Sequence, residues 1–293
     1  MNRVREFIGF EEQQDRPPKK AIGICILDSG IFPHMDFDTR IVDFCDFVGG
    51  KLSLYDDYGH GTHIAGISSG SGLRSQGRYR GIAAGTKLMI GKVLNQDGDG
   101  RIEHFLEAIQ WCIQNRNKYN IRLLNISVGL MRSVNGAWQK ELLDAVSDAW
   151  DHGIVTVCAA GNNGPKRGSV TIPGTQPKVI TVGSADKKKD GFSPSGYSGR
   201  GPTEDCVLKP EIYAPGTDIV SCGNNGLYVR KTGTSMSVPV VTGCIALLLQ
   251  QNPFLTPVEV KLRLYESACK MDRDRQTTWG MIYLPDLLSP VTR

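Results

Sequence analysis

The chain has 293 residues, of which 40% are hydrophobic and 22% are charged, and its formal net charge at pH 7 is +4. This composition is that of a globular protein long enough for one large α/β domain. The charge is too small to predict a nucleic-acid partner, and the longest nearly apolar run, CIALLL at 244–249, is too short to span a membrane.

The first twenty residues predict a polar N-terminal tail and no secretory signal. They carry charged residues every few positions, lack an apolar central region and contain Pro17 and Pro18. Without a signal peptide, we expect the cysteines to be buried free thiols in a reducing cytoplasm, although their even number also allows disulfides. The eight cysteines, none in a CxxC pair, are at positions 25, 45, 112, 158, 206, 222, 244 and 269.

Short apolar runs predict buried parallel strands, and helical patterns lie between them. The predicted strands cover 21–28, 87–93, 121–128, 153–160 and 178–184. Helices are predicted over 101–118 and 137–153 and after Thr256, where Thr256 and Glu259 form a capping-box pattern. This alternation predicts one domain over 21–293, an α/β fold with a doubly wound, mostly parallel sheet and helices on both faces.

Candidate functional residues stand where such a sheet places its ligands, beyond the carboxyl ends of strands. Asp28 closes the first predicted strand, and an acid there is either a turn residue or a partnered functional group. His60 and His63 lie in GHGTHIAGI, whose spacing does not match the zinc motif HExxH. Ser235 precedes an apolar helix. Each is ambiguous alone, but acyl transfer uses Asp, His and Ser together, and this chain order is one that the triad adopts.

Several segments resemble the signature segments of the subtilisin family (subtilases) of serine proteases. They are ILDSGI, GHGTHIAGI and GTSMSVP around the three candidates, together with AAGNNG at 159–164, NISVG at 125–129 and YSGRGPT at 197–203. The resemblance spans about residues 21–285 in the correct order. It implies the same doubly wound fold and a serine endopeptidase that hydrolyses peptide bonds through an acyl-enzyme.

The resemblance also implies residue roles. Ser235 would be the nucleophile, His60 the base, because the family uses the first histidine of HGTH, and Asp28 the group that orients it. Asn162 would donate its side-chain amide to the oxyanion, together with the Ser235 backbone N–H. Ser235 should then lie exposed at a helix N-terminus, with Pro239 early in that helix, where a missing N–H costs little.

Family resemblance further places an extended peptide substrate between two segments. Gly98–Gly100, which also reads as a tight turn, would flank one side and Ser127–Gly129 the other. Ile102 and Val128 would shape an apolar S4 subsite. The S1 pocket would have small or apolar walls that favour an uncharged P1 residue, formed by Val128, Ala159, Ala160, Gly161, Thr171, Ile172 and Pro173.

The chain resembles the intracellular bacterial subtilisins and, in segments 70–85 and 92–100, the AprX-like group. Since it is expected to lack a long propeptide, we expect residues 1–20 to fold across the cleft and restrain activity, the alternative being an unstructured tail. No cofactor is expected. Calcium is possible, because Asp36 matches a calcium-site residue of the family, but loop 70–80 carries Arg74, Arg78 and Arg80, which are unfavourable near a cation.

Other functions remain open at this point. The chain could be a dedicated processing protease, or a transpeptidase that passes the acyl group to an amine. It could also be a catalytically inactive peptide-binding module, although all four catalytic groups are present. Peptides or proteins are the expected partners, and the oligomeric state is left open.

Overall fold

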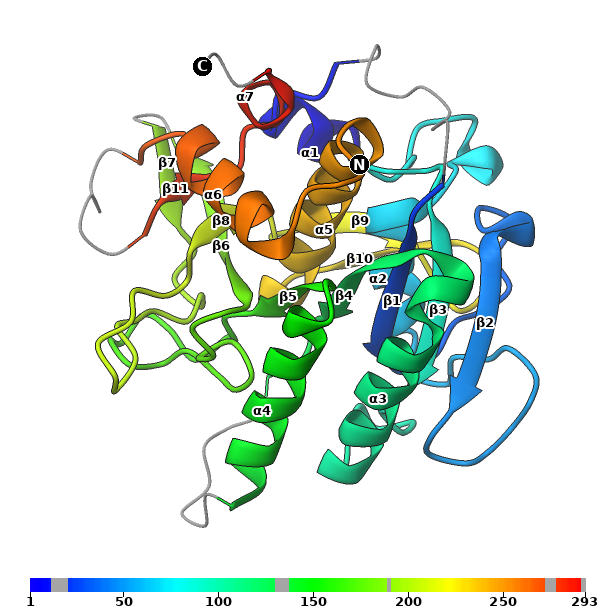
Figure 1. Ribbon diagram of the computed structural model, residues 1–293. Helices are drawn as coiled ribbons and strands as arrows, with labels where there is room; N and C mark the ends of the chain where they lie inside the picture. Colours follow the sequence, from blue (N-terminus) through cyan, green and yellow to red (C-terminus); the bar gives the residue numbers. More distant parts are fainter. Residues whose placement is uncertain (12–20, 130–136, 189–190, 272–277, 291–293) are drawn as a thin grey trace.

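The computed structural model describes residues 1–11, 21–129, 137–188, 191–271 and 278–290 (Figure 1). Its centre is a nine-stranded sheet with the strand order β11-β8-β6-β5-β4-β1-β3-β2, and β7 pairs with β6. Every strand pair in this sheet is parallel except β6–β7. The strands are β1 Gly23–Asp28, β2 Ile41–Asp46, β3 Lys87–Lys92, β4 Ile121–Ile126, β5 Val155–Ala159, β6 Ile180–Lys188, β7 Gly191–Pro194, β8 Ile212–Ala214 and β11 Gly280–Met281. A separate antiparallel hairpin joins β9 Ile219–Cys222 and β10 Tyr228–Lys231.

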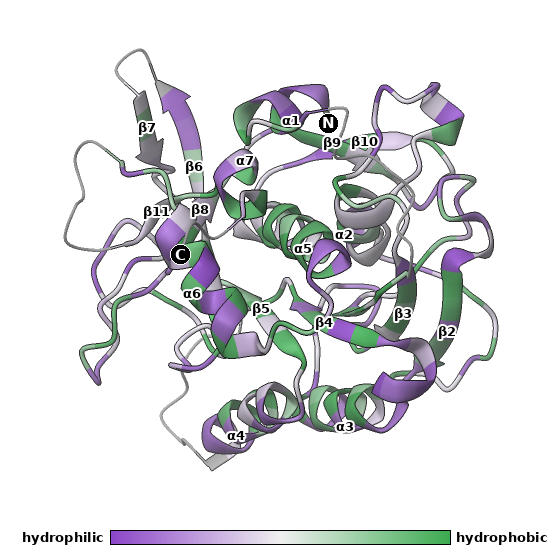
Figure 2. Cartoon of the chain, turned by 45° about the horizontal axis from the view of Figure 1, so that its top comes forward, coloured by the Kyte–Doolittle hydropathy of each residue, from purple (hydrophilic) through white to green (hydrophobic). Residues whose placement is uncertain are grey.

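Helices cover both faces of the sheet. Side chains of a strand point alternately to its two sides, and β1 shows the result. Ile24 and Ile26 pack with α2 and α5, whereas Cys25 and Leu27 pack with α3 and α4. Figure 2 shows these helix pairs on opposite sides of the sheet. The doubly wound α/β fold is therefore confirmed. The helices are α1 Asn2–Phe7, α2 His60–Ser69, α3 Ile102–Tyr119, α4 Ala137–Asp151, α5 Thr234–Gln251, α6 Pro257–Ser267 and α7 Leu284–Leu288.

The five predicted strands and three predicted helices are present, with ends that shift by a few residues. The capping box at the start of α6 is formed, with Thr256 and Glu259 each bonding the other's backbone N–H. Strand β2 was not predicted, because at the edge of the sheet its residues are only half buried and several are polar. The start of the predicted tail is also different from expectation. Residues 2–7 form α1, and Met1, Val4 and Ile8 are buried. Residues 12–20, with Pro17 and Pro18, lie outside the described part.

Helix α5 runs through the core. By length and composition alone it could cross a membrane, but 83% of it is buried inside the fold, as in a core helix. Pro239 lies inside this helix and not in its first turn, which corrects the expectation from the sequence. It is four residues after Ser235, so its missing N–H leaves the Ser235 carbonyl without its α-helical partner.

Candidate active site

The first pair of candidate residues is joined by a short hydrogen bond. Asp28 ends β1 and is fully buried, and His60 begins α2 with 15% of its side chain exposed. His60 Nδ1 lies 2.7 Å from Asp28 Oδ1 and 2.9 Å from Oδ2. Because a carboxylate only accepts, Nδ1 carries the proton, and Nε2 is left as the basic nitrogen of the neutral ring.

A third residue, Asp56, holds this pair in place. Asp56 Oδ1 accepts hydrogen bonds from the Ser29 hydroxyl at 2.8 Å and the Gly59 N–H at 2.6 Å. Its Oδ2 accepts from the N–H and the hydroxyl of Thr62 at 2.8 and 2.5 Å. Ser29 Oγ in turn accepts from the His60 N–H at 3.2 Å. One buried carboxylate therefore connects the end of β1 to the start of α2.

His63 has a different environment from His60. It is fully buried, and Nε2 lies 3.1 Å from the Ile219 carbonyl and 3.2 Å from the Val229 carbonyl. Both partners are acceptors, so Nε2 carries the proton. Burial, followed by the charges of His60 and Lys231, lowers the pKa of His63 to about 3. His63 is a neutral ring that ties α2 to the β9–β10 hairpin, and His60 is the histidine that meets Asp28.

Asn162 contacts the N-terminus of α5, the helix that carries Ser235. Ser235 is the second residue of the helix. Asn162, three residues after the end of β5, accepts from the Thr234 N–H at 2.9 Å and from the Thr234 hydroxyl at 3.0 Å through Oδ1. A Cβ atom added to Gly233 would lie 3.1 Å from Asn162 Nδ2. The oxygen of this amide is held by Thr234, which leaves the NH₂ group beside Gly233 as the available donor.

Thr171, one of the predicted S1 wall residues, is closely approached by Gly129 and Gly161. A Cβ atom at Gly129 would lie 2.0 Å from Thr171 Oγ1, and one at Gly161 would lie 2.5 Å from Thr171 Cγ2. The Thr171 N–H also donates to the Ala160 carbonyl at 3.1 Å. Gly129 and Gly161 therefore permit close packing around Thr171, and Gly161 also has a φ of +86° that suits glycine.

The two predicted peptide-flanking segments lie at the ends of β3 and β4. Ser127–Gly129 continue from β4, while Gly98–Gly100 belong to a turn closed by the Leu94–Gly100 bridge, as the tight-turn interpretation expected. Ile102 and Val128 are partly buried against the same apolar cluster. Sequence reasoning missed Tyr58. Its ring centroid lies 6.2 Å from that of His60, and Gly98 approaches it so closely that a Cβ atom would overlap the ring.

Asp36, the residue that matches a family calcium ligand, is surrounded by hydrogen-bond donors. It is fully buried, its Oδ1 accepts from the Arg74 N–H at 3.0 Å, and its Oδ2 accepts from the Tyr228 hydroxyl at 2.8 Å. Calcium requires six to eight oxygen ligands. Loop 70–80 therefore presents an N–H donor to Asp36, whereas a calcium site of that kind needs oxygen ligands from this loop.

All eight cysteines are free thiols. Five are buried, as expected, but Cys45 is half buried and Cys206 and Cys269 are exposed, which corrects the expectation that they would all be buried. Burial raises the pKa of several of them, Cys158 to about 12, so they are protonated.

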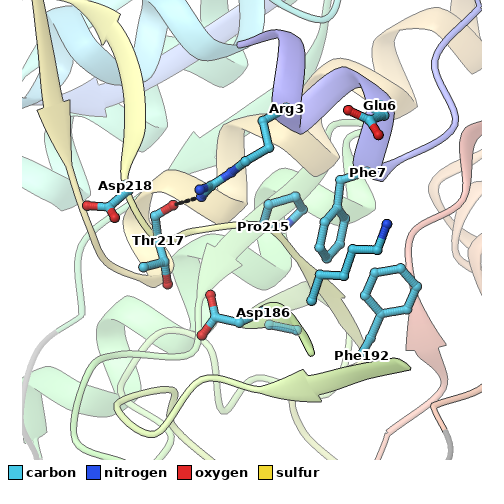
Figure 3. A pocket seen from close by; sticks show the side chains of 10 residues that line it. Arg3, Glu6, Phe7, Asp186, Phe192, Pro215, Thr217 and Asp218 are labelled. Atoms are coloured by element: carbon cyan, nitrogen blue, oxygen red, sulfur yellow. Dashed lines mark hydrogen bonds between the residues drawn. The ribbon is translucent and has the colours of Figure 1, made fainter. Parts of the chain in front are cut away.

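Helix α1 packs beside the loop that supports the start of α5. Arg3 donates to the Thr217 carbonyl at 2.6 Å, and the ring of Phe7 lies 4.6 Å from that of Phe192 (Figure 3). A cavity of about 370 Å³ remains between them. One residue before Thr217, the Gly216 carbonyl accepts from the Gly233 N–H at 3.0 Å. A continuous path of contacts therefore connects α1 to the residues before Ser235.

Comparison with known proteins agrees with this geometry. Residues 19–281 match the model of the subtilase family, a peptidase family. The chain is 39% identical over 285 residues to the serine protease AprX of Bacillus subtilis (strain 168), covering 89% of this chain and 64% of AprX. It is 32% identical over 269 residues to the minor extracellular protease Epr of the same organism, covering 90% of this chain and 38% of Epr.

Among solved structures, a cold-adapted subtilisin-like serine proteinase aligns with a TM-score of 0.75 and 30% identity, over 92% of this chain and 96% of that one. The chain thus spans less than two thirds of the AprX and Epr relatives but nearly all of this solved domain. From the family match over residues 19–281, together with the Asp28–His60 pair and Ser235 at the start of α5, we conclude that the chain belongs to the subtilase family.

Proposed function

We propose that this chain is a serine endopeptidase, with Ser235 as nucleophile, His60 as general base, Asp28 as its orienting carboxylate and Asn162 as an oxyanion donor. The observation that carries the proposal is the 2.7 Å contact between Asp28 and His60 Nδ1, which leaves Nε2 basic. A serine at a helix N-terminus and an amide with a free NH₂ group beside it supply the remaining parts.

The reaction follows from these groups. His60 Nε2 takes the Ser235 hydroxyl proton as Oγ attacks the carbonyl carbon of the scissile bond. The negative oxygen that forms receives hydrogen bonds from Asn162 Nδ2 and the Ser235 N–H, near the positive end of the α5 dipole. His60 then gives its proton to the leaving amine. Water, activated by the same nitrogen, hydrolyses the acyl-enzyme.

The substrate is an extended peptide with an uncharged P1 residue. The close packing of Gly129 and Gly161 around Thr171 gives a wall without a carboxylate or a cationic group, which supports this preference. The S4 subsite would be apolar, from Ile102 and Val128. We expect peptides with Phe or Leu at P1 to have kcat/KM values at least about tenfold above the matched Lys and Glu peptides. Equal values would contradict the assigned S1 walls.

The first test is hydrolysis of a chromogenic peptide by the wild type and Ser235→Ala, with and without a sulfonyl fluoride. Loss of the nucleophile costs on the order of a million-fold in kcat in subtilisin, so activity should vanish. A general base must be unprotonated to accept the serine proton, so the rate should also rise from acid to alkaline pH. Equal turnover in both proteins would reject the assignment. Mass spectrometry of the products separates hydrolysis, which adds water, from transfer to an amine.

We also propose an intracellular location without a calcium requirement. Eight free thiols, two of them exposed, support a reducing compartment. The donors around Asp36 support activity without calcium. Chelation by EGTA should leave kcat/KM unchanged, and cell fractionation with an antibody should find the protein inside the cell. Secretion into the medium would contradict the first part, and loss of activity in EGTA the second.

A further inference from the structure

A second cluster of reactive side chains lies apart from the Asp28–His60 pair. His34 and Asp36 follow β1, and Cys222 ends β9. Each offers one atom that can bind a metal, and these atoms all lie within 4.8 Å of one another. All three side chains are buried. The cluster therefore combines an imidazole, a carboxylate and a thiol from two separate segments.

The three side chains of the cluster are linked to one another by hydrogen bonds and close contacts. Cys222 Sγ donates to Asp36 Oδ2 at 3.5 Å, and His34 Nδ1 lies 3.8 Å from Asp36 Oδ1 and accepts from the Asp36 N–H at 3.1 Å. The His34 imidazole also has hydrogen-bond interactions with the backbone of Gly226 and Leu227. The cluster is therefore a compact set of three buried side chains whose nitrogen, oxygen and sulfur atoms lie close together.

We propose that His34, Asp36 and Cys222 bind a divalent transition-metal ion of the zinc type. Nitrogen, oxygen and sulfur ligands together favour zinc over calcium or magnesium. On a tetrahedral zinc ion, bond lengths of about 2.0–2.3 Å place neighbouring ligand atoms roughly 3.3–3.6 Å apart. The distances of 3.5 Å from Cys222 Sγ to Asp36 Oδ2 and of 3.8 Å from His34 Nδ1 to Asp36 Oδ1 are close to this range. A carboxylate and a thiolate would also neutralise the charge of the dication.

Metal binding would replace the Cys222–Asp36 hydrogen bond by a sulfur–metal bond, and the thiol proton would pass to solvent. In the metal-free protein, burial raises the pKa of Cys222 above its usual range, so the proton stays on sulfur. The Tyr228 hydroxyl, 2.8 Å from Asp36 Oδ2, can keep its hydrogen bond and orient the carboxylate as an outer-shell partner. The ion would link the segment after β1 to β9.

Cobalt(II) tests the proposal, because a thiolate ligand gives it a charge-transfer band in the near ultraviolet. The Ser235→Ala variant prevents self-digestion and makes the result independent of peptidase activity. Since the site is buried, cobalt is added under reducing conditions both to folded protein and during refolding. We expect one bound equivalent with a thiolate band, displaced by zinc, and a higher melting temperature with zinc.

The band should disappear in Cys222→Ser and in His34→Gln and persist in the control Cys269→Ala, whose thiol is exposed. Circular dichroism checks that each variant is folded. A folded Ser235→Ala protein without a thiolate band would overturn the proposal, and so would a band that persists without Cys222. If both site variants fail to fold, the Ser235→Ala titration decides alone.

Discussion

The side-chain oxygen of Asn162 accepts hydrogen bonds from both the N–H and the hydroxyl of Thr234, the residue before Ser235. An amide held in this way has only its NH₂ group left to donate. Thr234 therefore sets the direction in which Asn162 points, and it does so from the same helix turn that presents the nucleophile.

This relationship predicts two effects of different size. Asn162→Ala should lower kcat by about 100- to 1,000-fold, the cost of losing one oxyanion donor in subtilisin. Thr234→Val keeps the side-chain shape and the N–H bond but removes the hydroxyl bond, worth about 1 kcal/mol, so kcat should fall about fivefold. Steady-state kinetics of both variants measure these changes in kcat. A larger loss from Thr234→Val than from Asn162→Ala would contradict the orientation assigned to the amide.

Asp56 is predicted to be a positioning residue for His60. Asp56→Asn has nearly the same shape, but its NH₂ group would face donors such as the Thr62 N–H and Gly59 N–H. We expect kcat to fall tenfold or more, because about 1 Å of displacement can cost 100-fold in rate, while KM changes little.

The matched control is Asp144→Asn, an exposed acid on α4, which should change neither constant. The pH profile of kcat separates positioning from simple destabilisation, because a displaced His60 changes the profile and a smaller folded fraction only scales it. A scaled profile of unchanged shape would count against the role of Asp56.

The parts of the fold that were predictable are those encoded in contiguous residues. The GICILD strand is apolar up to its last residue, Asp28, because both of its faces are covered, and the Thr256–Glu259 cap is complete within four residues. The triad was predicted from three motifs of the family, and the structure shows the contact between two of its members, Asp28 and His60.

What could not be predicted depends on contacts between distant segments. From the sequence, Asp56 looks like an ordinary acidic loop residue. Its role depends on the hydrogen bond with Ser29, which lies 27 residues earlier in the chain. Val4 in α1 and Ile8 directly after it have the spacing of one helical face, but six residues are too few to predict a helix. Tertiary packing against α7 stabilises this short helix, and there the Ile8 carbonyl accepts a hydrogen bond from the Leu284 N–H at 2.8 Å.

The buried state of His63 predicts acid sensitivity. The pKa of His63 is lowered to about 3 in the fold, from about 6.5 when exposed, chiefly by burial. Between these values the unfolded chain binds a proton that the folded chain does not, so the stabilisation is complete above pH 6.5 and is lost as the pH falls toward 3. The full loss is on the order of 5 kcal/mol.

His63→Gln retains an N–H donor near the position of Nε2 but does not titrate. Urea unfolding of Ser235→Ala proteins, with and without His63→Gln, should therefore show a smaller loss of unfolding free energy between pH 6.5 and 4 in the double variant. Parallel curves over this interval would show that His63 is not the group responsible. Peptidase activity of the single His63→Gln variant at pH 8 should remain, in contrast to His60→Gln.

The final prediction concerns restraint of the site by residues 1–20, which remains a proposal. Since Val4 and Ile8 are buried, deletion of residues 2–16 removes core contacts worth about 3–6 kcal/mol together with any inhibition.

The variant Arg3→Ala separates inhibition from stability better, because it removes only the contact with Thr217 at the exposed edge of α1. If α1 restrains the residues before Ser235 through Gly216, Arg3→Ala should raise the initial rate of peptide hydrolysis severalfold with little change in melting temperature. Asn2→Ala, on the same helix, is the control and should leave the rate unchanged. Identical progress curves for the wild type, Arg3→Ala and the deletion would show that this segment stabilises the fold without regulating the enzyme.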